Sequence, residues 1–64
     1  MTNLQRIRKA AGLSRAELAE ITGLKLSAIR DYEQNHKPIN KAAAISAYKL
    51  AEALNCTIEE LLEK

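Results

Sequence analysis

Residues 13–29 read LSRAELAEITGLKLSAI and predict two short helices joined by a tight turn. Residues 14–17 (Ser-Arg-Ala-Glu) form a capping box, in which the Ser hydroxyl and the Glu carboxylate each satisfy one free N–H at a helix start. Gly23 ends that helix, because glycine adopts the left-handed conformation without strain. Helices joined so closely must cross at a steep angle, with a small residue at the contact (Ala19) and an apolar anchor on the second helix (Ile29). The fold is organised around this corner.

Signals for further helices flank the corner on both sides. Start signals are side chains that can cap a helix, and they occur at residues 2–5 (Thr-Asn-Leu-Gln), Asn40 and residues 57–60 (Thr-Ile-Glu-Glu). Stop signals are residues that tolerate positive φ, namely Gly12, Asn35 and Asn55. We therefore expect five helices, the third from about Leu26 to Gln34 and the fourth from the Asn40 cap through Leu54. Lys25 stands at the expected cap of the third helix and is a poor capping residue.

Each expected helix carries apolar residues at steps of three and four, the spacing of one helix face. These residues are Leu4, Ile7 and Ala11; Leu18, Ala19 and Ile21; Ile29 and Tyr32; Ala43, Ala47, Leu50, Ala51 and Leu54; and Ile58, Leu61 and Leu62. The apolar residues expected to close the junctions between helices are Leu13, Leu24, Ile39 and Cys56. Abundant alanine, with no valine, tryptophan or phenylalanine, favours helix over sheet. The sequence predicts an all-α fold, a compact five-helix bundle forming one domain over residues 1–64.

Length and composition exclude several kinds of protein. Sixty-four residues allow one domain. One cysteine (Cys56) and one histidine (His36) form neither an internal disulfide nor a metal cluster, which fits a reducing cytoplasm. The longest apolar run, residues 42–45, is too short to span a membrane, and the first residues lack the apolar core of a signal peptide. With no paired nucleophile and base, no phosphate-binding glycine loop and no sign of a cofactor or small-molecule ligand, an enzyme is not expected.

The net charge of +2 is unevenly distributed along the chain. Residues 1–41 contain eight Lys or Arg and four Asp or Glu, whereas residues 42–64 contain two Lys and four Glu. A basic N-terminal part and an acidic C-terminal part suit a protein that presents one face to a polyanion, although ordinary solvated surfaces also show such patterns.

Several segments resemble the phage-repressor (Cro/CI-like, XRE) helix-turn-helix family, and together they cover nearly the full chain. They are residues 13–23 (LSRAELAEITG), 32–35 (YEQN), 49–54 (KLAEAL) and 56–62 (CTIEELL). The resemblance implies a lambda-repressor-like DNA-binding domain whose helix-turn-helix spans about residues 15–34. It implies sequence-specific binding of double-stranded DNA by a transcriptional repressor, with the third helix in the major groove. Such a protein, bacterial or phage-encoded, is expected in the cytoplasm with the nucleoid.

Carried over by position, the resemblance assigns three groups of residues. The base-reading residues would be Lys25, Leu26, Ser27 and Arg30. The phosphate-binding residues, at helix starts and loops where free N–H groups also attract phosphate, would be Arg15, Lys37, Asn40 and Lys41. A structural ion pair would join Arg8 to Glu33 and fix the third helix against the first.

Three features depart from the family pattern. Leu26 stands where the family often has Gln or Arg, Asp31 puts a negative charge near DNA, and the stretch 33–50 is about one helical turn longer than usual. Leu26 could contact a thymine methyl group or cover the edge of the core. Asp31 could orient Arg15 or Arg30, or be solvated.

Two expectations concern partners. One such domain covers few base pairs, so we expect a homodimer on DNA, with Ile45, Tyr48 and the last helix in the contact. The rival function is a protein-interaction or antitoxin-like module that keeps the same fold. The third helix discriminates between them, because an acidic or apolar surface there would favour a protein partner, whereas its basic and polar residues favour DNA.

Overall fold

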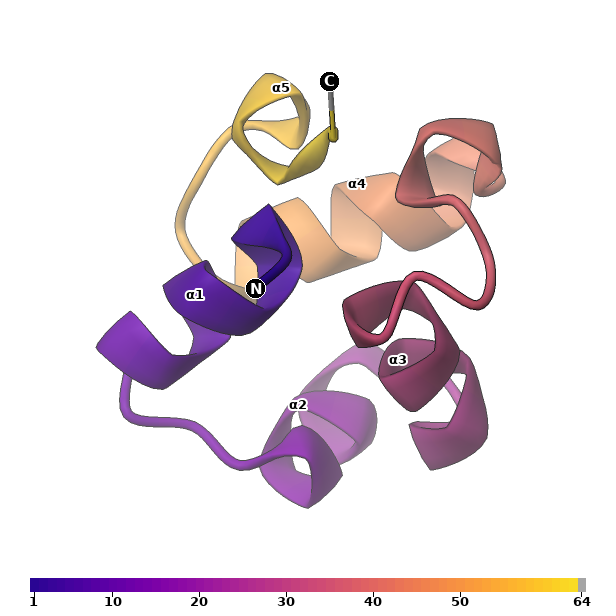
Figure 1. The fold of residues 1–64 in the computed structure, drawn as a ribbon. Helices are drawn as coiled ribbons and strands as arrows, with labels where there is room; N and C mark the ends of the chain where they lie inside the picture. Colours follow the sequence, from indigo (N-terminus) through magenta and orange to yellow (C-terminus); the bar gives the residue numbers. More distant parts are fainter. Residues whose placement is uncertain (64) are drawn as a thin grey trace.

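The computed structural model describes residues 1–63 as an all-helical bundle of five α-helices and one short 3-10 helix (Figure 1). The elements are α1 (Asn3–Ala10), α2 (Arg15–Thr22), α3 (Leu26–Glu33), η1 (Ile39–Lys41), α4 (Ala44–Ala53) and α5 (Ile58–Leu61). These residues contain no strand, and the predicted fold class is confirmed. The longest helix, α4, has 10 residues, and within residues 1–63 no helix has the length and apolar character needed to cross a bilayer.

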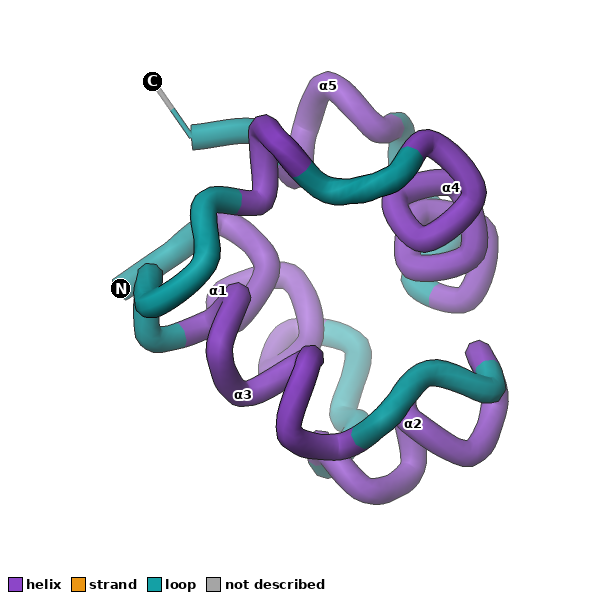
Figure 2. Tube along the Cα trace, turned by 90° about the vertical axis from the view of Figure 1, so that its right-hand side faces the viewer, coloured by secondary structure: helices purple, strands orange, loops and turns teal. Residues whose placement is uncertain are grey.

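The corner between α2 and α3 has the predicted chemistry. Ser14 Oγ accepts from the Glu17 N–H at 3.0 Å, and Glu17 Oε1 accepts from the Ser14 N–H at 2.9 Å, which completes the capping box. Gly23 ends α2 with φ 75°, and its N–H donates to the carbonyl of Ala19 at 2.8 Å. As expected for a poor capping residue, Lys25 makes no capping bond within the described chain. Figure 2 shows the short connection that carries the chain from α2 into α3.

The start of α1 differs from the prediction, because Thr2 forms only half of the expected capping box. Its Oγ1 accepts from the Gln5 N–H at 3.3 Å, but its hydroxyl donates to the carbonyl of Glu33, at the end of α3, at 3.1 Å. A second N–H in the first turn, that of Asn3, donates to Oε2 of Glu63 at 2.6 Å. The start of α1 is thereby tied to α3 and to the C-terminal segment.

The start of α4 also differs, because Asn40 does not cap this helix. α4 begins at Ala44, and Asn40 lies in η1, within the stretch that looks longer than usual in the sequence. The Asn40 side chain instead bonds the backbone of Glu63, donating from Nδ2 to its carbonyl at 2.5 Å and accepting from its N–H at 2.8 Å. η1 also buries Ile39, so this turn packs onto the core.

The core receives one fully buried large side chain from each α-helix: Leu4, Leu18, Ile29, Leu50 and Leu61. Each such burial contributes about 1.5–3 kcal/mol relative to exposure. The other expected core residues that are buried are Ala47, Ala51 and Leu54. The junction residues are buried or pack against this cluster as expected: Leu13, Leu24, Ile39 and Cys56.

Three residues assigned to the core from helical spacing are exposed: Ala11, Ile21 and Ala43. Ala11 follows the last residue of α1 and Ala43 precedes the first residue of α4, so helical spacing does not apply to them. Ile21 does lie in α2, but the buried face of α2 runs through Leu18 and Thr22. Ile21 lies off this face and is 59% exposed.

Candidate nucleic-acid interface

The start of α3 presents an exposed surface. Ile29 and Glu33, four residues apart, form the buried face of α3. All four of the predicted base-reading residues, which lie at the start of the helix or beside this face, are exposed: Lys25, Leu26, Ser27 and Arg30. Leu26 is 47% exposed, which favours an external contact over the alternative of a core-edge residue. The surface offers a ligand two basic groups, one hydroxyl and one apolar side chain.

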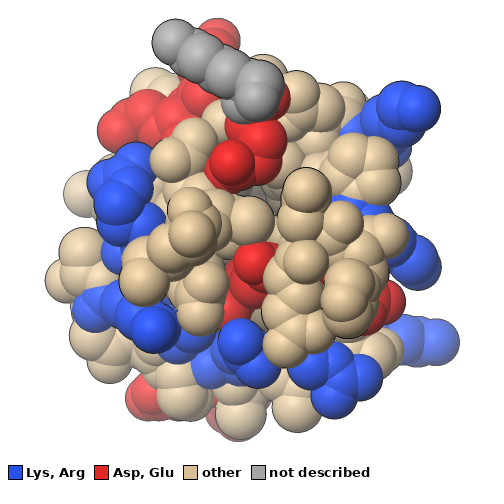
Figure 3. All heavy atoms as spheres, viewed as in Figure 1, with Lys and Arg blue, Asp and Glu red and all other residues tan. Residues whose placement is uncertain are grey.

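Basic side chains also flank this surface. Arg15, the first residue of α2, is partly buried, whereas three predicted phosphate-binding residues in or next to η1 are exposed: Lys37, Asn40 and Lys41. Figure 3 shows Lys and Arg on the left, lower and right parts of the face in view, whereas the largest group of Asp and Glu lies near the top, towards α5. Smaller patches of Asp and Glu lie among the basic groups.

A buried carboxylate joins three helices beneath this surface. Glu33 Oε2 accepts from Arg8 Nε at 2.5 Å and Glu33 Oε1 accepts from Arg8 Nη2 at 3.1 Å, so the expected ion pair is present. Oε1 also accepts from Arg15 Nε at 2.8 Å. The side chain of Glu33 is 0% exposed, that of Arg8 is 9% exposed and that of Arg15 is 32% exposed. Glu33 therefore binds two guanidinium groups, one buried and one near the surface.

Sequence reasoning missed the bond between Arg15 and Glu33. The two residues are 18 positions apart, at the start of one helix and the end of another. Neither residue type nor spacing signals such a contact, because an Arg at a helix start is equally compatible with a solvated side chain. Only the crossing of α2 and α3 brings the two groups together.

Asp31 lies beside the loop that follows α3, and its side chain is 29% exposed, which fits the expectation of partial solvation. It does not orient Arg15, because Arg15 bonds Glu33, and Asp31 Oδ1 lies 3.8 Å from Nδ1 of His36. The Asp31 carbonyl accepts from the N–H of His36 at 2.8 Å and from that of Lys37 at 3.3 Å. Asp31 thus fixes the start of the loop that carries Lys37.

The N-terminus of α2 is partly occupied by its own capping box. The Glu17 carboxylate accepts from the Ser14 backbone N–H. Hydrogen bonds to Ser14, first to its backbone and to a smaller extent to its side chain, lower the pKa of Glu17. A carboxylate at this helix end competes with an external anion for the N–H group and for the positive end of the helix dipole. An anion bound at this place would therefore depend on the guanidinium of Arg15 more than on the helix end.

A different surface lies along α4. Ile45 and Tyr48, which we expected in a subunit contact, are 59% and 52% exposed. Tyr48 Oη donates to Glu52 Oε2 at 2.8 Å, and this bond raises the pKa of Tyr48. A shallow hollow of about 330 Å³ between α4 and α5 is lined by Tyr48 and Cys56, among others. Burial raises the pKa of the Cys56 thiol, so the thiol stays protonated at neutral pH.

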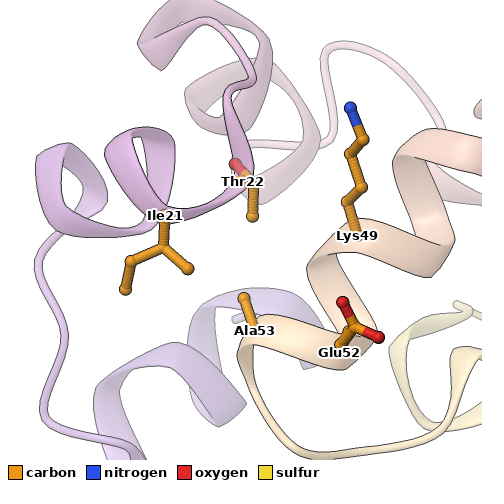
Figure 4. Close-up of a pocket in the computed structure, with 5 residues that line it drawn as sticks. All are labelled: Ile21, Thr22, Lys49, Glu52 and Ala53. Atoms are coloured by element: carbon orange, nitrogen blue, oxygen red, sulfur yellow. The ribbon is translucent and has the colours of Figure 1, made fainter.

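A second shallow hollow, of about 360 Å³, lies between α2 and α4 (Figure 4). Its lining residues are Ile21 and Thr22 from the end of α2, and Lys49, Glu52 and Ala53 from α4. The hollow combines apolar groups with one ammonium and one carboxylate. It lies at the opposite end of α2 from Arg15 and so belongs to the α4 surface rather than to the basic one.

A helix-turn-helix family model matches residues 4–61, from the first turn of α1 to the last residue of α5. The match includes the α2–α3 corner and the three residues of the buried ion network. No curated protein matches the chain.

Proposed function

The chain belongs to the helix-turn-helix family of the Cro/CI-like (XRE) type, and from this membership we propose that it is a transcriptional repressor that binds double-stranded DNA sequence-specifically. In this proposal α3 lies in the major groove and its first turn contacts base edges. The observation that carries the proposal is the exposed surface at the start of α3, where Lys25 and Arg30 place two basic groups and Ser27 one hydroxyl, with further cations on both sides. The proposed activity requires neither a cofactor nor catalysis.

The proposed base contacts follow from the chemistry of the α3 surface. Arg30 can donate two parallel hydrogen bonds to O6 and N7 of guanine, a contact worth about 1–3 kcal/mol of discrimination. Lys25, at the start of α3, can donate to the same kind of edge. Ser27 can donate or accept and so discriminates weakly, whereas Leu26 can only offer its methyl groups to a thymine methyl.

The proposed phosphate contacts come from Arg15, Lys37, Lys41 and the Asn40 region. Both polar atoms of the Asn40 side chain bond Glu63, so we assign Asn40 chiefly to holding η1 in place. A phosphate contact by Asn40 would use a second bond from Nδ2 or a backbone N–H. Each neutralised phosphate contributes about −0.9 to the slope of log K against log salt concentration. Most of the binding free energy is assigned to these contacts.

We further propose that two copies bind one operator as a homodimer. Ile45 and Tyr48 support this proposal, because both are more than half exposed on α4, and Tyr48 lines the hollow between α4 and α5. A symmetric dimer would place the two α3 helices about 34 Å apart on one face of the duplex. A footprint with two symmetric half-sites would support this arrangement, and a single asymmetric site at saturation would contradict it.

The proposed setting follows from the proposed activity. Residues 1–64 would act as one DNA-binding domain in the cytoplasm of a bacterium or a phage-infected cell, associated with the nucleoid. Neither a membrane nor a small-molecule ligand takes part in this proposal.

Selection of bound sequences from random duplex DNA tests the proposal. We expect enrichment of an inverted repeat whose half-site holds a G contacted by Arg30 and a neighbouring T beside Leu26. The alternative is a protein-interaction or antitoxin-like module, which the exposed Ile21 and Tyr48 on the α4 side would suit. That alternative predicts no enriched sequence, and either such a result or binding that is indifferent to salt would overturn the DNA-binding proposal.

A further inference from the structure

We propose that Glu33 is a positioning residue for DNA binding: through Arg15 Nε it fixes the Arg15 guanidinium so that its terminal nitrogens, Nη1 and Nη2, bind a backbone phosphate. The inference rests on the proposed DNA binding and adds a mechanism to it. Arg15 would be a prepared phosphate clamp, in contrast to a mobile surface charge.

The first support is the charge balance of the buried network. One carboxylate, Glu33, accepts three hydrogen bonds from two guanidinium groups, those of Arg8 and Arg15. The three side chains together carry a net charge of +1. Arg8 is nearly buried and uses its remaining Nη1 to bond the carbonyl of Leu13 at 2.8 Å. The uncompensated positive charge therefore falls on Arg15, the member of the network with access to solvent.

The second support is the geometry of Arg15. Its Nε is bonded to a carboxylate that is 0% exposed, while its own side chain remains 32% exposed. Within residues 1–63, the hydrogen bonds of this side chain end on Glu33. The Nη1 and Nη2 groups are therefore left for an outside acceptor, and a phosphate matches this planar pair of donors.

The third support is the place of the network in the fold. Arg15 is the first residue of α2 and Glu33 the last of α3, so their bond ties together the outer ends of the two corner helices. The Arg15 side chain is ordered before any ligand arrives, and ordering a side chain on binding is one of the costs of association. A phosphate held by Arg15 would also set the position of α3, because the carboxylate that anchors Arg15 belongs to Glu33, the last residue of α3.

The test compares Arg15→Lys with the matched control Arg6→Lys, in which an exposed α1 arginine outside the network loses its guanidinium. Lysine keeps the positive charge, but its single ammonium cannot bond Glu33 as Nε does and present two planar donors to a phosphate. We expect Arg15→Lys to weaken binding to the preferred duplex about tenfold and to nonspecific duplexes by a smaller factor, with the salt slope unchanged. Arg6→Lys should bind like the wild type, and thermal melting monitored by circular dichroism verifies that both variants are folded.

The outcomes separate the inference from the proposed function. If the wild type binds no duplex DNA, the proposed function fails and the inference fails with it. If the wild type binds DNA and Arg15→Lys binds equally well, only the inference is overturned.

A second measurement on the wild-type protein needs no variant. In ¹⁵N–¹H spectra, the Arg15 Nε–H should be protected from solvent exchange in the free protein, and its Nη groups should become protected when duplex DNA is added. The Nη signals would change in proportion to the fraction of protein bound to DNA, whereas an ion pair with a purely structural role would leave them unchanged. Rapid exchange of Nε–H in the free protein, or Nη groups unchanged by saturating DNA, would overturn the inference.

Discussion

The α2–α3 corner and the segment between α3 and α4 both bring positive charge to the surface, but they hold it in different ways. At the corner, Arg15 bonds the buried carboxylate of Glu33, and the ends of α2 are fixed by a capping box and a left-handed glycine. In the later segment, Lys37 and Lys41 are exposed, and what fixes their positions is the backbone of the surrounding turns. In this protein, a buried partner fixes the direction of a surface charge, whereas an ordered turn fixes only its approximate location.

The two arrangements suit two different tasks in the proposed complex. A contact that sets the register of α3 on the duplex requires a group whose direction is fixed, because an error there displaces every base contact. Neutralising phosphate charge tolerates mobility, since the free energy comes mainly from the release of counterions. We therefore expect the corner to control which sequence is bound, and the later segment to control how tightly any duplex is bound.

The largest effect is expected when the corner loses its buried carboxylate. Glu33→Ala leaves the buried guanidinium of Arg8 without its counter-charge, which destabilises the fold by about 3–5 kcal/mol. Urea unfolding monitored by circular dichroism measures this loss. Glu20→Ala, at an exposed position of α2, is the control and should stay within about 0.5 kcal/mol of the wild type. Equal midpoints for the two variants would mean that the network does not stabilise the corner.

The next effect concerns base reading by the corner. Arg30→Ala should remove about 1–3 kcal/mol of discrimination at one base pair and leave nonspecific affinity nearly intact. Leu26→Gln should shift preference at the neighbouring position from T towards A, because glutamine pairs with the adenine edge. Repeating the selection from random duplexes with each variant measures both changes. An Arg30→Ala variant that loses affinity equally for every sequence would show that Arg30 contacts a phosphate.

The corner was predictable from the sequence because its signals are local. Ser14 and Glu17 are three residues apart, and Gly23 acts through its own backbone conformation, so a single segment contains both the cause and the effect. The base-reading residues were likewise assigned from the resemblance, and all four are exposed: Lys25, Leu26, Ser27 and Arg30. Family resemblance also pointed to the pair of Arg8 and Glu33, which spacing alone does not reveal.

The later segment was not predictable, because the partners of its residues are distant in sequence. Asn40 has the side chain of a good helix cap, but its amide bonds Glu63, 23 positions away, and α4 begins only at Ala44. The prediction that Ile21 is buried is wrong for a related reason. Helical spacing gives the possible faces of a helix, and tertiary packing decides which of them is buried. The second guanidinium on Glu33 belongs to the same class of long-range contact.

Removing the Asn40 amide tests how firmly the later segment is held. Asn40→Ala loses two hydrogen bonds to the backbone of Glu63 and should cost about 1 kcal/mol, since each such bond contributes roughly 0.5–1.5 kcal/mol and this pair is exposed to solvent. For a domain of this size the melting temperature should fall by about 4–8 °C. Asn40→Asp keeps the acceptor and loses the donor, so it should lie between Asn40→Ala and the wild type. A melting temperature for Asn40→Ala equal to that of the wild type would contradict this role.

The charge of the later segment should act on all sequences alike. Lys37→Ala should weaken binding to every duplex by a similar factor and reduce the magnitude of the salt slope by about 0.9, because one phosphate is no longer neutralised. Fluorescence anisotropy at several salt concentrations measures both quantities. Lys49→Ala, on the α4 surface, is the matched control and should leave the slope unchanged. If Lys37→Ala alters the preferred sequence, the division of tasks between the two regions is wrong.

The smallest effect concerns the capping box at the corner, and it depends on pH. Hydrogen bonds to Ser14 lower the folded-state pKa of Glu17, so this carboxylate stabilises the fold at pH values above its unfolded pKa, about 4.3. That contribution is lost as the pH falls through the lowered folded-state pKa, where Glu17 becomes protonated in both states. Glu17→Gln, which keeps the shape of the side chain and removes its charge, should therefore melt below the wild type by a constant margin above pH 5, and the margin should shrink as the pH falls through the lowered folded-state pKa. Glu60→Gln, which makes the same change in the capping box of α5, should show the same pH dependence, because hydrogen bonds to Thr57 lower the pKa of Glu60 in the same way. A Glu17→Gln deficit as large at low pH as at pH 7 would mean that the charge of Glu17 does not contribute to the cap, and that the hydroxyl of Ser14 caps α2 without its help.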